Sequence, residues 1–103
     1  MEDLPADFSV VSNLDFVREL PGLKSLALSY NQLTDLVPLA ALTNLTRFEA
    51  SMNMLTNLNE IDTLPGLSFV AVNGNLLDLE SGSESMRVVQ MLTNRGAKVY
   101  FEP

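Results

Sequence analysis

Three asparagines, Asn31, Asn53 and Asn75, recur every 22 residues and carry side chains that can bind ligands or backbone groups. A side-chain amide has N–H donors and a carbonyl acceptor, so it can bind a metal ion or a sugar, and it can also pair backbone groups in a bend. A residue present in every unit of a periodic pattern is first a structural residue. We therefore predict that the three amides form a ladder that pairs buried backbone groups of successive units.

Few other side chains could support catalysis or metal binding. The chain has no cysteine and no histidine, which excludes disulfides, thiolate and imidazole metal sites, cysteine nucleophiles and Ser-His-Asp triads. Asp35, Glu60 and Asp62 fall in repeated turns, and we interpret them as solvated or turn-capping residues rather than calcium ligands. The triplet Asn-Leu-Thr at 44–46 fits a glycosylation acceptor, but without a secretory signal we interpret it as a turn. We predict no enzyme activity, no cofactor and no metal.

The charge balance is acidic, since thirteen Asp and Glu against six Lys and Arg give a net charge of −7. The basic residues are scattered along the chain, at Arg18, Lys24, Arg47, Arg87, Arg95 and Lys98. Such a surface repels nucleic-acid backbones and anionic membranes, so neither is a predicted partner. Among possible partners the acidity favours a basic protein or peptide, but we prefer the simpler interpretation that the acidity only keeps the protein soluble.

The chain of 103 residues carries one continuous pattern without a linker, which predicts a single domain over 1–103. No apolar stretch approaches the ~20 residues that span a bilayer. The first residues, Met-Glu-Asp-Leu-Pro, lack the basic start and apolar run of a signal peptide. We expect a cytoplasmic protein if the chain is complete, and this expectation lapses if it is a fragment.

The asparagines close a phrase that begins at Leu23, Leu45 and Leu67, with the pattern Leu-x-x-Leu-x-Leu-x-x-Asn and apolar substitutes. Alternation within each phrase predicts a short strand, with inward residues Leu26, Leu28, Phe48, Ala50, Val70 and Val72. Apolar residues then recur at a spacing of three, which suits 3₁₀ or irregular turns better than a long helix. Units of this kind stack into an α/β solenoid, with a concave parallel β-sheet and a convex side of short turns.

Both ends of the pattern differ from its middle, 23–79. Residues 1–22 keep the apolar register but place Ser9 at the asparagine position and Pro5 in the strand, which predicts a degenerate first repeat with an edge strand. Residues 80–103 predict a cap made of a helix and a strand. Ser81 with Glu84, or Ser83, would begin the helix, Met86, Val89 and Leu92 would face the core, and Gly96 would end the helix. A strand over 97–102 would follow, with Val99 and Phe101 inward.

These phrases resemble the leucine-rich repeat superfamily, specifically its 22-residue class. The stretches 31–45 and 53–67 are similar to repeats of bacterial internalins and of phosphatase-regulatory repeat proteins. The resemblance covers 23–79 strongly and 1–22 weakly, and 80–103 does not continue the consensus. It implies a curved, non-catalytic scaffold that binds proteins or peptides on its concave sheet.

The strand residues that alternate with the core positions would form rows across that sheet. One row contains Ser25, Arg47, Phe69 and Lys98, the next contains Ala27, Glu49, Ala71 and Tyr100, and the third contains Ser29, Ser51, Asn73 and Glu102. Phe69 and Tyr100 are predicted as apolar anchors of a partner, as expected for hot spots. The predicted partner-binding residues are Tyr30, Arg47, Glu49, Met52, Phe69, Ala71, Asn73, Lys98 and Tyr100.

We interpret the chain as a protein–protein interaction module, an adaptor or an inhibitor. One alternative is an inert face whose charges form ordinary solvated pairs, such as Arg47 with Glu49. Another is a structural, self-associating unit that forms a homodimer through the concave face or an edge strand. A sheet of four or five strands is only ~20 Å wide, so a partner would bind weakly or also contact the loops.

Overall fold

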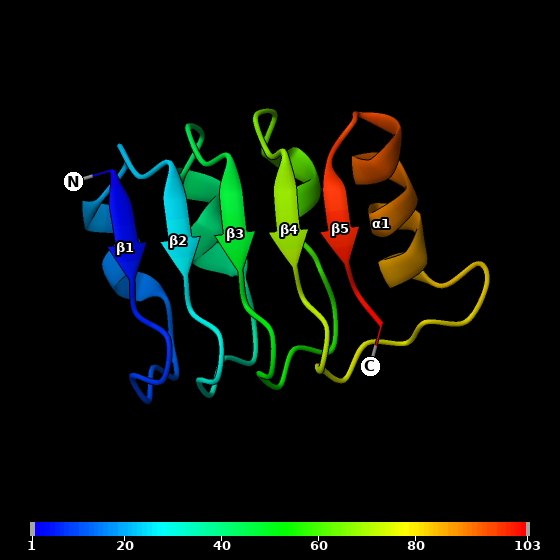
Figure 1. Ribbon diagram of the computed structural model, residues 1–103, viewed down its shortest axis with the longest axis horizontal. Helices are drawn as coiled ribbons and strands as arrows, with labels where there is room; N and C mark the ends of the chain where they lie inside the picture. Colours follow the sequence, from blue (N-terminus) through cyan, green and yellow to red (C-terminus); the bar gives the residue numbers. More distant parts are fainter. Residues whose placement is uncertain (1, 103) are drawn as a thin grey trace.

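Five short parallel strands form one sheet in chain order, β1-β2-β3-β4-β5 (Figure 1). The computed structural model describes residues 2–102. The strands are β1 (Asp3–Pro5), β2 (Ser25–Ala27), β3 (Arg47–Glu49), β4 (Phe69–Ala71) and β5 (Lys98–Tyr100). Their central residues pair in one line, Leu4, Leu26, Phe48, Val70 and Val99. The register advances by 22 residues at each of the first three steps and by 29 at the last.

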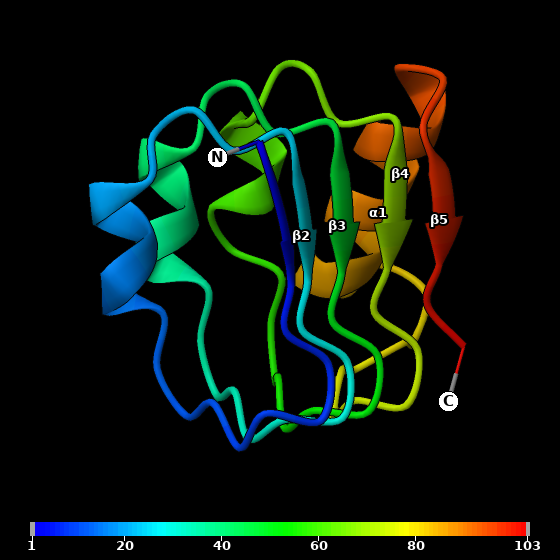
Figure 2. The same ribbon diagram turned by 60° about the vertical axis from the view of Figure 1, so that its left-hand side comes forward.

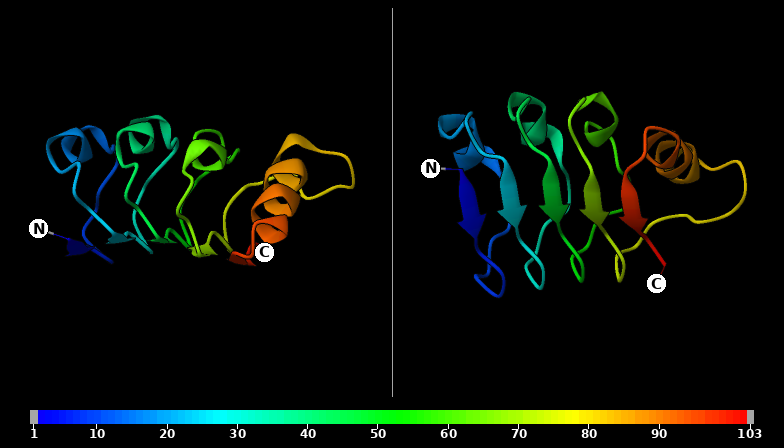
Figure 3. Two further views of the ribbon diagram at one scale, coloured as in Figure 1. Left: turned by 90° about the horizontal axis from the view of Figure 1, so that it is seen from above. Right: turned by 45° about the horizontal axis from the view of Figure 1, so that its top comes forward.

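The returning segments cover one face of this sheet. They contain the 3₁₀ helices η1 (Asp15–Glu19), η2 (Val37–Ala41) and η3 (Ile61–Thr63), and the last contains the α-helix α1 (Glu84–Asn94). Figures 2 and 3 show all of these elements on the same side of the strands, and in Figure 3 the turns fan out more widely than the strands. The sheet therefore lies on the inner side of a shallow curve. The predicted solenoid with short 3₁₀ turns is confirmed.

The core lies between the sheet and the turns. Leucines from every regular coil (one strand with its returning segment) are completely buried there, and Phe48 is the largest fully buried side chain. The leucine spacing of three explains the 3₁₀ turns, because side chains at i and i+3 lie on the same side of such a helix. Each fully buried leucine stabilises the fold by about 1.5–3 kcal/mol relative to exposure.

The first coil follows the predicted register with a thinner core. Leu14 and Val17 are buried, whereas Leu4, Val11 and Leu20 are only partly buried against the core. Pro5 lies in the edge strand β1, where a missing N–H does not interrupt the sheet. Residues 1–22 thus supply one incomplete coil at the end of the solenoid.

The C-terminal cap has the predicted helix and strand, and the helix begins at the second of the two predicted N-cap candidates. Ser83, not Ser81, is the N-cap, since its Oγ accepts a hydrogen bond from the Met86 N–H at 3.2 Å. The helix ends at Asn94 with Arg95 as its C-cap. Gly96 follows with a φ of 95° and donates its N–H to the Thr93 oxygen at 2.9 Å, which is the αL stop that glycine favours. The buried face of the helix is Ser85, Val88, Val89 and Leu92. Val88 was not predicted there, and Met86 is only partly buried.

Candidate interaction surfaces

The asparagine amides pair backbone groups of neighbouring coils. Asn53 accepts from the Leu33 N–H at 3.0 Å and donates to the oxygens of Leu28 at 2.9 Å and Ala50 at 3.1 Å. Asn31 makes the equivalent bonds one coil earlier, and its Oδ1 accepts from the N–H groups of Ser9 and Val11 at 3.0 and 2.8 Å. Donors and acceptor of these amides are thus engaged with the main chain, which is a structural role and leaves little capacity for a ligand.

The sheet face turned away from the turns is here called the open face. Its first row is Asp3, Ser25, Arg47, Phe69 and Lys98, and its second is Pro5, Ala27, Glu49, Ala71 and Tyr100. These are the predicted rows, extended at one end by Asp3 and Pro5. Ala71 lies in its predicted row but is only 9% exposed, so a partner would contact it little. Lys98 is exposed at the opposite edge.

Three side chains on adjacent strands form the Arg47–Phe69–Tyr100 cluster. The Arg47 guanidinium carbon lies 3.9 Å from the centre of the Phe69 ring, a cation–π geometry. The Phe69 and Tyr100 rings are tilted by 47° with centroids 5.5 Å apart, an arrangement that aromatic pairs favour. Glu49 accepts a bond from Arg47 Nη2 at 2.6 Å. The predicted residues Arg47, Glu49, Phe69 and Tyr100 therefore share one contiguous surface.

A cavity of about 330 Å³ lies at the carboxyl ends of β4 and β5. It is lined by Asn73, Val99, Tyr100, Phe101 and Glu102. Asn73 is held in place because its Oδ1 accepts a bond from the Ser51 hydroxyl at 2.6 Å. Tyr100 belongs to both the cluster and the cavity wall, so the two features are continuous. The lining is of mixed polarity, with Val99, Tyr100 and Phe101 beside Asn73 and Glu102, which suits a side chain with an apolar stem and a polar end.

Tyr30 and Met52 lie beyond the ends of β2 and β3, as predicted, in the loops and not on the strands. Both residues have a left-handed backbone, with φ of 60° and 59°, and the equivalent positions Phe8 and Gly74 have φ of 58° and 74°. Phe8 stacks on Tyr30 with ring centroids 4.5 Å apart and planes inclined by 10°. These residues begin the loops that follow the carboxyl ends of the strands. We call the surface of these loops the carboxyl rim.

The carboxyl rim also contains apolar residues that were not predicted: Phe8, Val10, Met54 and Leu76 are all exposed. One signal in the sequence points to them. They stand immediately before or after the ladder positions 9, 31, 53 and 75. The side chains of Asn31 and Asn53 are buried, whereas the residues immediately before and after them are exposed. Large apolar residues at those neighbours are therefore surface residues.

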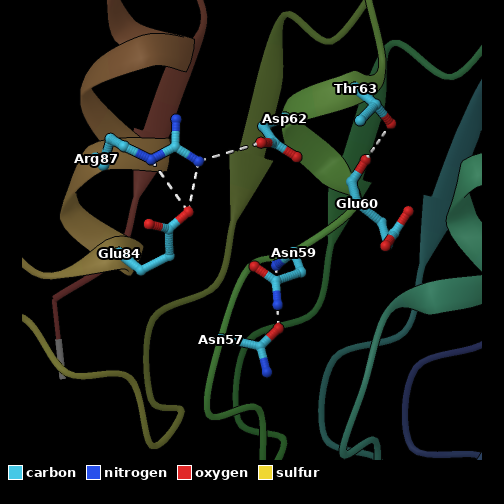
Figure 4. Close-up of polar contacts among 7 residues, drawn as sticks. All are labelled: Asn57, Asn59, Glu60, Asp62, Thr63, Glu84 and Arg87. Carbon is cyan, nitrogen blue, oxygen red and sulfur yellow. Dashed lines mark hydrogen bonds and ion pairs between the residues drawn. The ribbon is translucent and has the colours of Figure 1, made fainter.

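Acidic residues of the returning segments serve the turns and the cap. Asp35 Oδ1 accepts from the Val37 N–H at 3.1 Å, and the Glu60 carbonyl accepts from the Thr63 hydroxyl at 2.6 Å (Figure 4). Arg87 on α1 bonds to Glu84 and reaches Asp62 at 3.4 Å, which joins the cap to the turn of η3 (Figure 4). The hydrogen bond from Arg87 lowers the pKa of Glu84. Within residues 2–102, no three acidic side chains gather in a way that could hold a metal ion.

No helix in the described part of the chain combines the length and apolar character needed to cross a membrane.

Comparison with known proteins supports the fold. No protein-family profile matches the chain. Human leucine-rich repeat-containing protein 56 is 34% identical over 73 residues, which cover 68% of this chain and 14% of that protein. An internalin (inlF) of Listeria monocytogenes superposes with a TM-score of 0.86 at 24% identity, covering 99% of this chain and 28% of the other. A leucine-rich repeat protein of Leptospira interrogans superposes with a TM-score of 0.82 at 27% identity, covering 98% and 25%.

The chain is therefore a leucine-rich repeat protein, and this fold suggests a protein–protein interaction module. The chain spans 14% of the curated relative's length. It also spans only about a quarter of the two solved structures, 28% and 25%. Assignment to the 22-residue class stays a prediction.

Proposed function

We propose that the chain is a non-catalytic binding module that holds a protein or peptide segment on its open face, as an adaptor or an inhibitor. The observation that carries this proposal is the Arg47–Phe69–Tyr100 cluster, which places two aromatic rings and a guanidinium side by side on β3, β4 and β5. Arginine and aromatic residues dominate the energetics of protein interfaces. The cluster lies on the face of the sheet opposite the buried core, and none of its three residues belongs to that core.

The cluster is organised before a partner arrives. Arg47 is held between the Phe69 ring and the Glu49 carboxylate. Binding would therefore cost Arg47 less conformational entropy than it would cost a freely rotating side chain. Its remaining N–H donors can meet a carboxylate or a backbone carbonyl of the partner. An apolar side chain of the partner can pack on Phe69 and Tyr100, and a second side chain can enter the cavity next to Tyr100.

The test begins with selection of binding peptides from a random library displayed on phage, with the whole chain immobilised. Selected peptides are then titrated calorimetrically against Phe69→Ala, Tyr100→Ala and Arg47→Ala. Asp35→Asn is the matched control, because it lies on a convex turn and keeps the oxygen that caps Val37. Loss of binding in the three open-face variants alone supports the proposal. Equal binding by all variants contradicts it.

Sedimentation of the same samples separates binding of a partner from self-association. A monomer at micromolar concentration is expected. A dimer that the Tyr100→Ala substitution dissociates would instead favour the structural, self-associating unit.

A further inference from the structure

We propose that the carboxyl rim is a second binding surface, adjoining the open face at the cavity beside Tyr100, and that it takes a basic amphipathic helix of another protein. Nine large apolar side chains are exposed in the described part of the chain, and six of them lie on this rim. They are Phe8, Val10, Tyr30, Met52, Met54 and Leu76. Exposed apolar side chains that gather in one place mark interaction sites, whereas scattered ones do not.

The six residues form two rows on either side of the asparagine ladder. The inner row is Phe8, Tyr30 and Met52, followed by Gly74. The outer row is Val10, Gln32, Met54 and Leu76. Successive loops are tied by main-chain bonds, such as Tyr30 N–H to the Ser51 oxygen at 2.9 Å and Met54 N–H to the Leu33 oxygen at 2.9 Å. The rows are thus held at the spacing of adjacent strands, with the exposed Gln32 as the polar member of the outer row.

Backbone conformation sets the rim residues apart from ordinary surface residues. Phe8, Val10, Tyr30 and Met52 all have φ between 56° and 60°, a region that is unfavourable for side chains other than glycine, asparagine and aspartate. Gly74 shows that the fold accepts glycine at the equivalent position of the next coil. The chain nevertheless carries large apolar side chains at three of the four inner positions. The left-handed conformation recurs at this position in successive coils and therefore belongs to the bend of the repeat. What distinguishes the rim is that large, exposed apolar side chains occupy these positions.

Charge defines the chemistry of the partner. The rim loops, 6–14, 28–36, 50–60 and 72–82 with 101–102, contain no Lys or Arg. Their acidic residues near the strand ends are Asp7, Asp78, Glu80 and Glu102, whereas Asp35 and Glu60 stand further along, where the turns η2 and η3 begin. An apolar strip among carboxylates attracts a segment that combines apolar and basic side chains. A second copy of this chain would bring two acidic rims together, which like-charge repulsion disfavours.

The dimensions of the strip fit a helix. Four loops at the ~4.8 Å spacing of neighbouring strands give a strip ~15–20 Å long. A helix rises ~5.4 Å per turn, so one apolar side chain per turn can contact each loop of the rim in succession. Lysines and arginines that flank such an apolar stripe would then lie over the acidic loops.

Two designed helical peptides of about 14 residues, ~21 Å long, provide the test. One has a leucine stripe flanked by lysines, and the other has serines in place of the leucines and the same charge. The leucine–lysine peptide is expected to bind the whole chain at about 0.15 M salt, and the serine–lysine peptide at least about tenfold more weakly. Equal binding of the two peptides would show attraction by net charge alone and would overturn the proposal.

A rim variant carries Phe8→Asn, Val10→Asn, Met54→Ser and Leu76→Ser, since asparagine tolerates the left-handed backbone at positions 8 and 10. A matched control carries Phe16→Ser and Val37→Ser, which removes exposed apolar side chains from the turns η1 and η2 instead. Affinity for the leucine–lysine peptide should fall at least about tenfold in the rim variant and stay unchanged in the control. Unchanged affinity in the rim variant would overturn the proposal.

Amide NMR of the unsubstituted protein keeps the test independent of how well the variant folds. The leucine–lysine peptide should shift the amide signals of Tyr30, Met52, Met54 and Leu76 and leave those of Arg47 and Phe69 in place. Shifts confined to the open face would mean that this peptide binds the surface of the proposed function and not the rim. Wild-type dimers that the rim variant dissociates would identify a second copy as the occupant, against the proposal.

Discussion

Asn53 donates from its side-chain nitrogen to the main-chain oxygen of Leu28, 2.9 Å away and 25 residues earlier in the chain. Its Oδ1 accepts from the Leu33 N–H in the same earlier coil. One side chain therefore joins the exit of a strand to the coil before it. Because Asn53 is only 6% exposed, water cannot replace these bonds when the amide is removed.

Asn53→Ala should lower the free energy of unfolding by ~1–3 kcal/mol, since it leaves buried backbone groups unpaired. The measurement is the urea midpoint with the slope held constant. Asn57→Ala is the control, because Asn57 accepts only one exposed bond, from the Asn59 N–H (Figure 4). The structural role of the ladder fails if the two variants have the same midpoint.

Leu92→Ala should destabilise the protein by ~2–5 kcal/mol, the usual range for a leucine deleted from a core. Leu92 is fully buried on the inner face of α1, whereas Gln90 of the same helix is exposed. Gln90→Ala should therefore leave thermal unfolding nearly unchanged. Comparable losses in both variants would show that α1 does not pack as described.

Removal of 80–103 should cause aggregation or unfolding, because α1 and β5 cover the apolar end of the solenoid. Val70 and Val72 are fully buried in the whole chain, and β5 supplies the partner of β4. Terminal caps of repeat proteins have this role in general. A soluble 1–79 fragment with a cooperative melting transition would contradict the prediction.

Alanine substitution of Phe69, Tyr100 or Arg47 should weaken binding of an open-face partner by ~1–3 kcal/mol, as truncation of hot-spot residues does. The melting temperature should change little, because none of the three side chains belongs to the buried core. Calorimetric titration and thermal unfolding of the same samples measure both effects. Parallel losses of affinity and stability would assign these residues to the fold instead.

The Glu84 carboxyl should titrate below its ordinary range in NMR, because the hydrogen bond from Arg87 lowers its pKa. A lowered folded-state pKa means stabilisation that is present above the ordinary Glu value of about 4.3. This stabilisation is lost as the pH falls through the lower folded-state value. Arg87→Gln should move the titration upward, and Arg95→Gln should not. An unchanged Glu84 titration in Arg87→Gln would disprove the pairing.

The sequence by itself determined the solenoid. Three features of the sequence reflect local geometry that repeats in every coil. They are the spacing of the asparagines, the alternation around Leu26, Phe48 and Val70, and the spacing of three residues between leucines. Local geometry is what a periodic pattern encodes. The same register placed Arg47 beside Phe69, because residues at equivalent positions of stacked coils must be neighbours. Tyr100 was placed on the next strand through the predicted C-terminal strand, where it pairs with Ala71.

Only the tertiary structure decided how side chains of different coils contact one another. It also decided between alternatives that the local sequence left open, such as the two N-cap candidates of the C-terminal helix. Ser81 and Ser83 are both plausible caps, and the Asp78 oxygen that accepts from the Ser83 hydroxyl at 2.7 Å comes from the preceding loop. Phe8, Tyr30 and Met52 have a left-handed backbone, although phenylalanine, tyrosine and methionine disfavour that conformation. The asparagine bonds between coils impose it. The carboxyl rim is thus a product of contacts between coils, which a linear pattern does not specify.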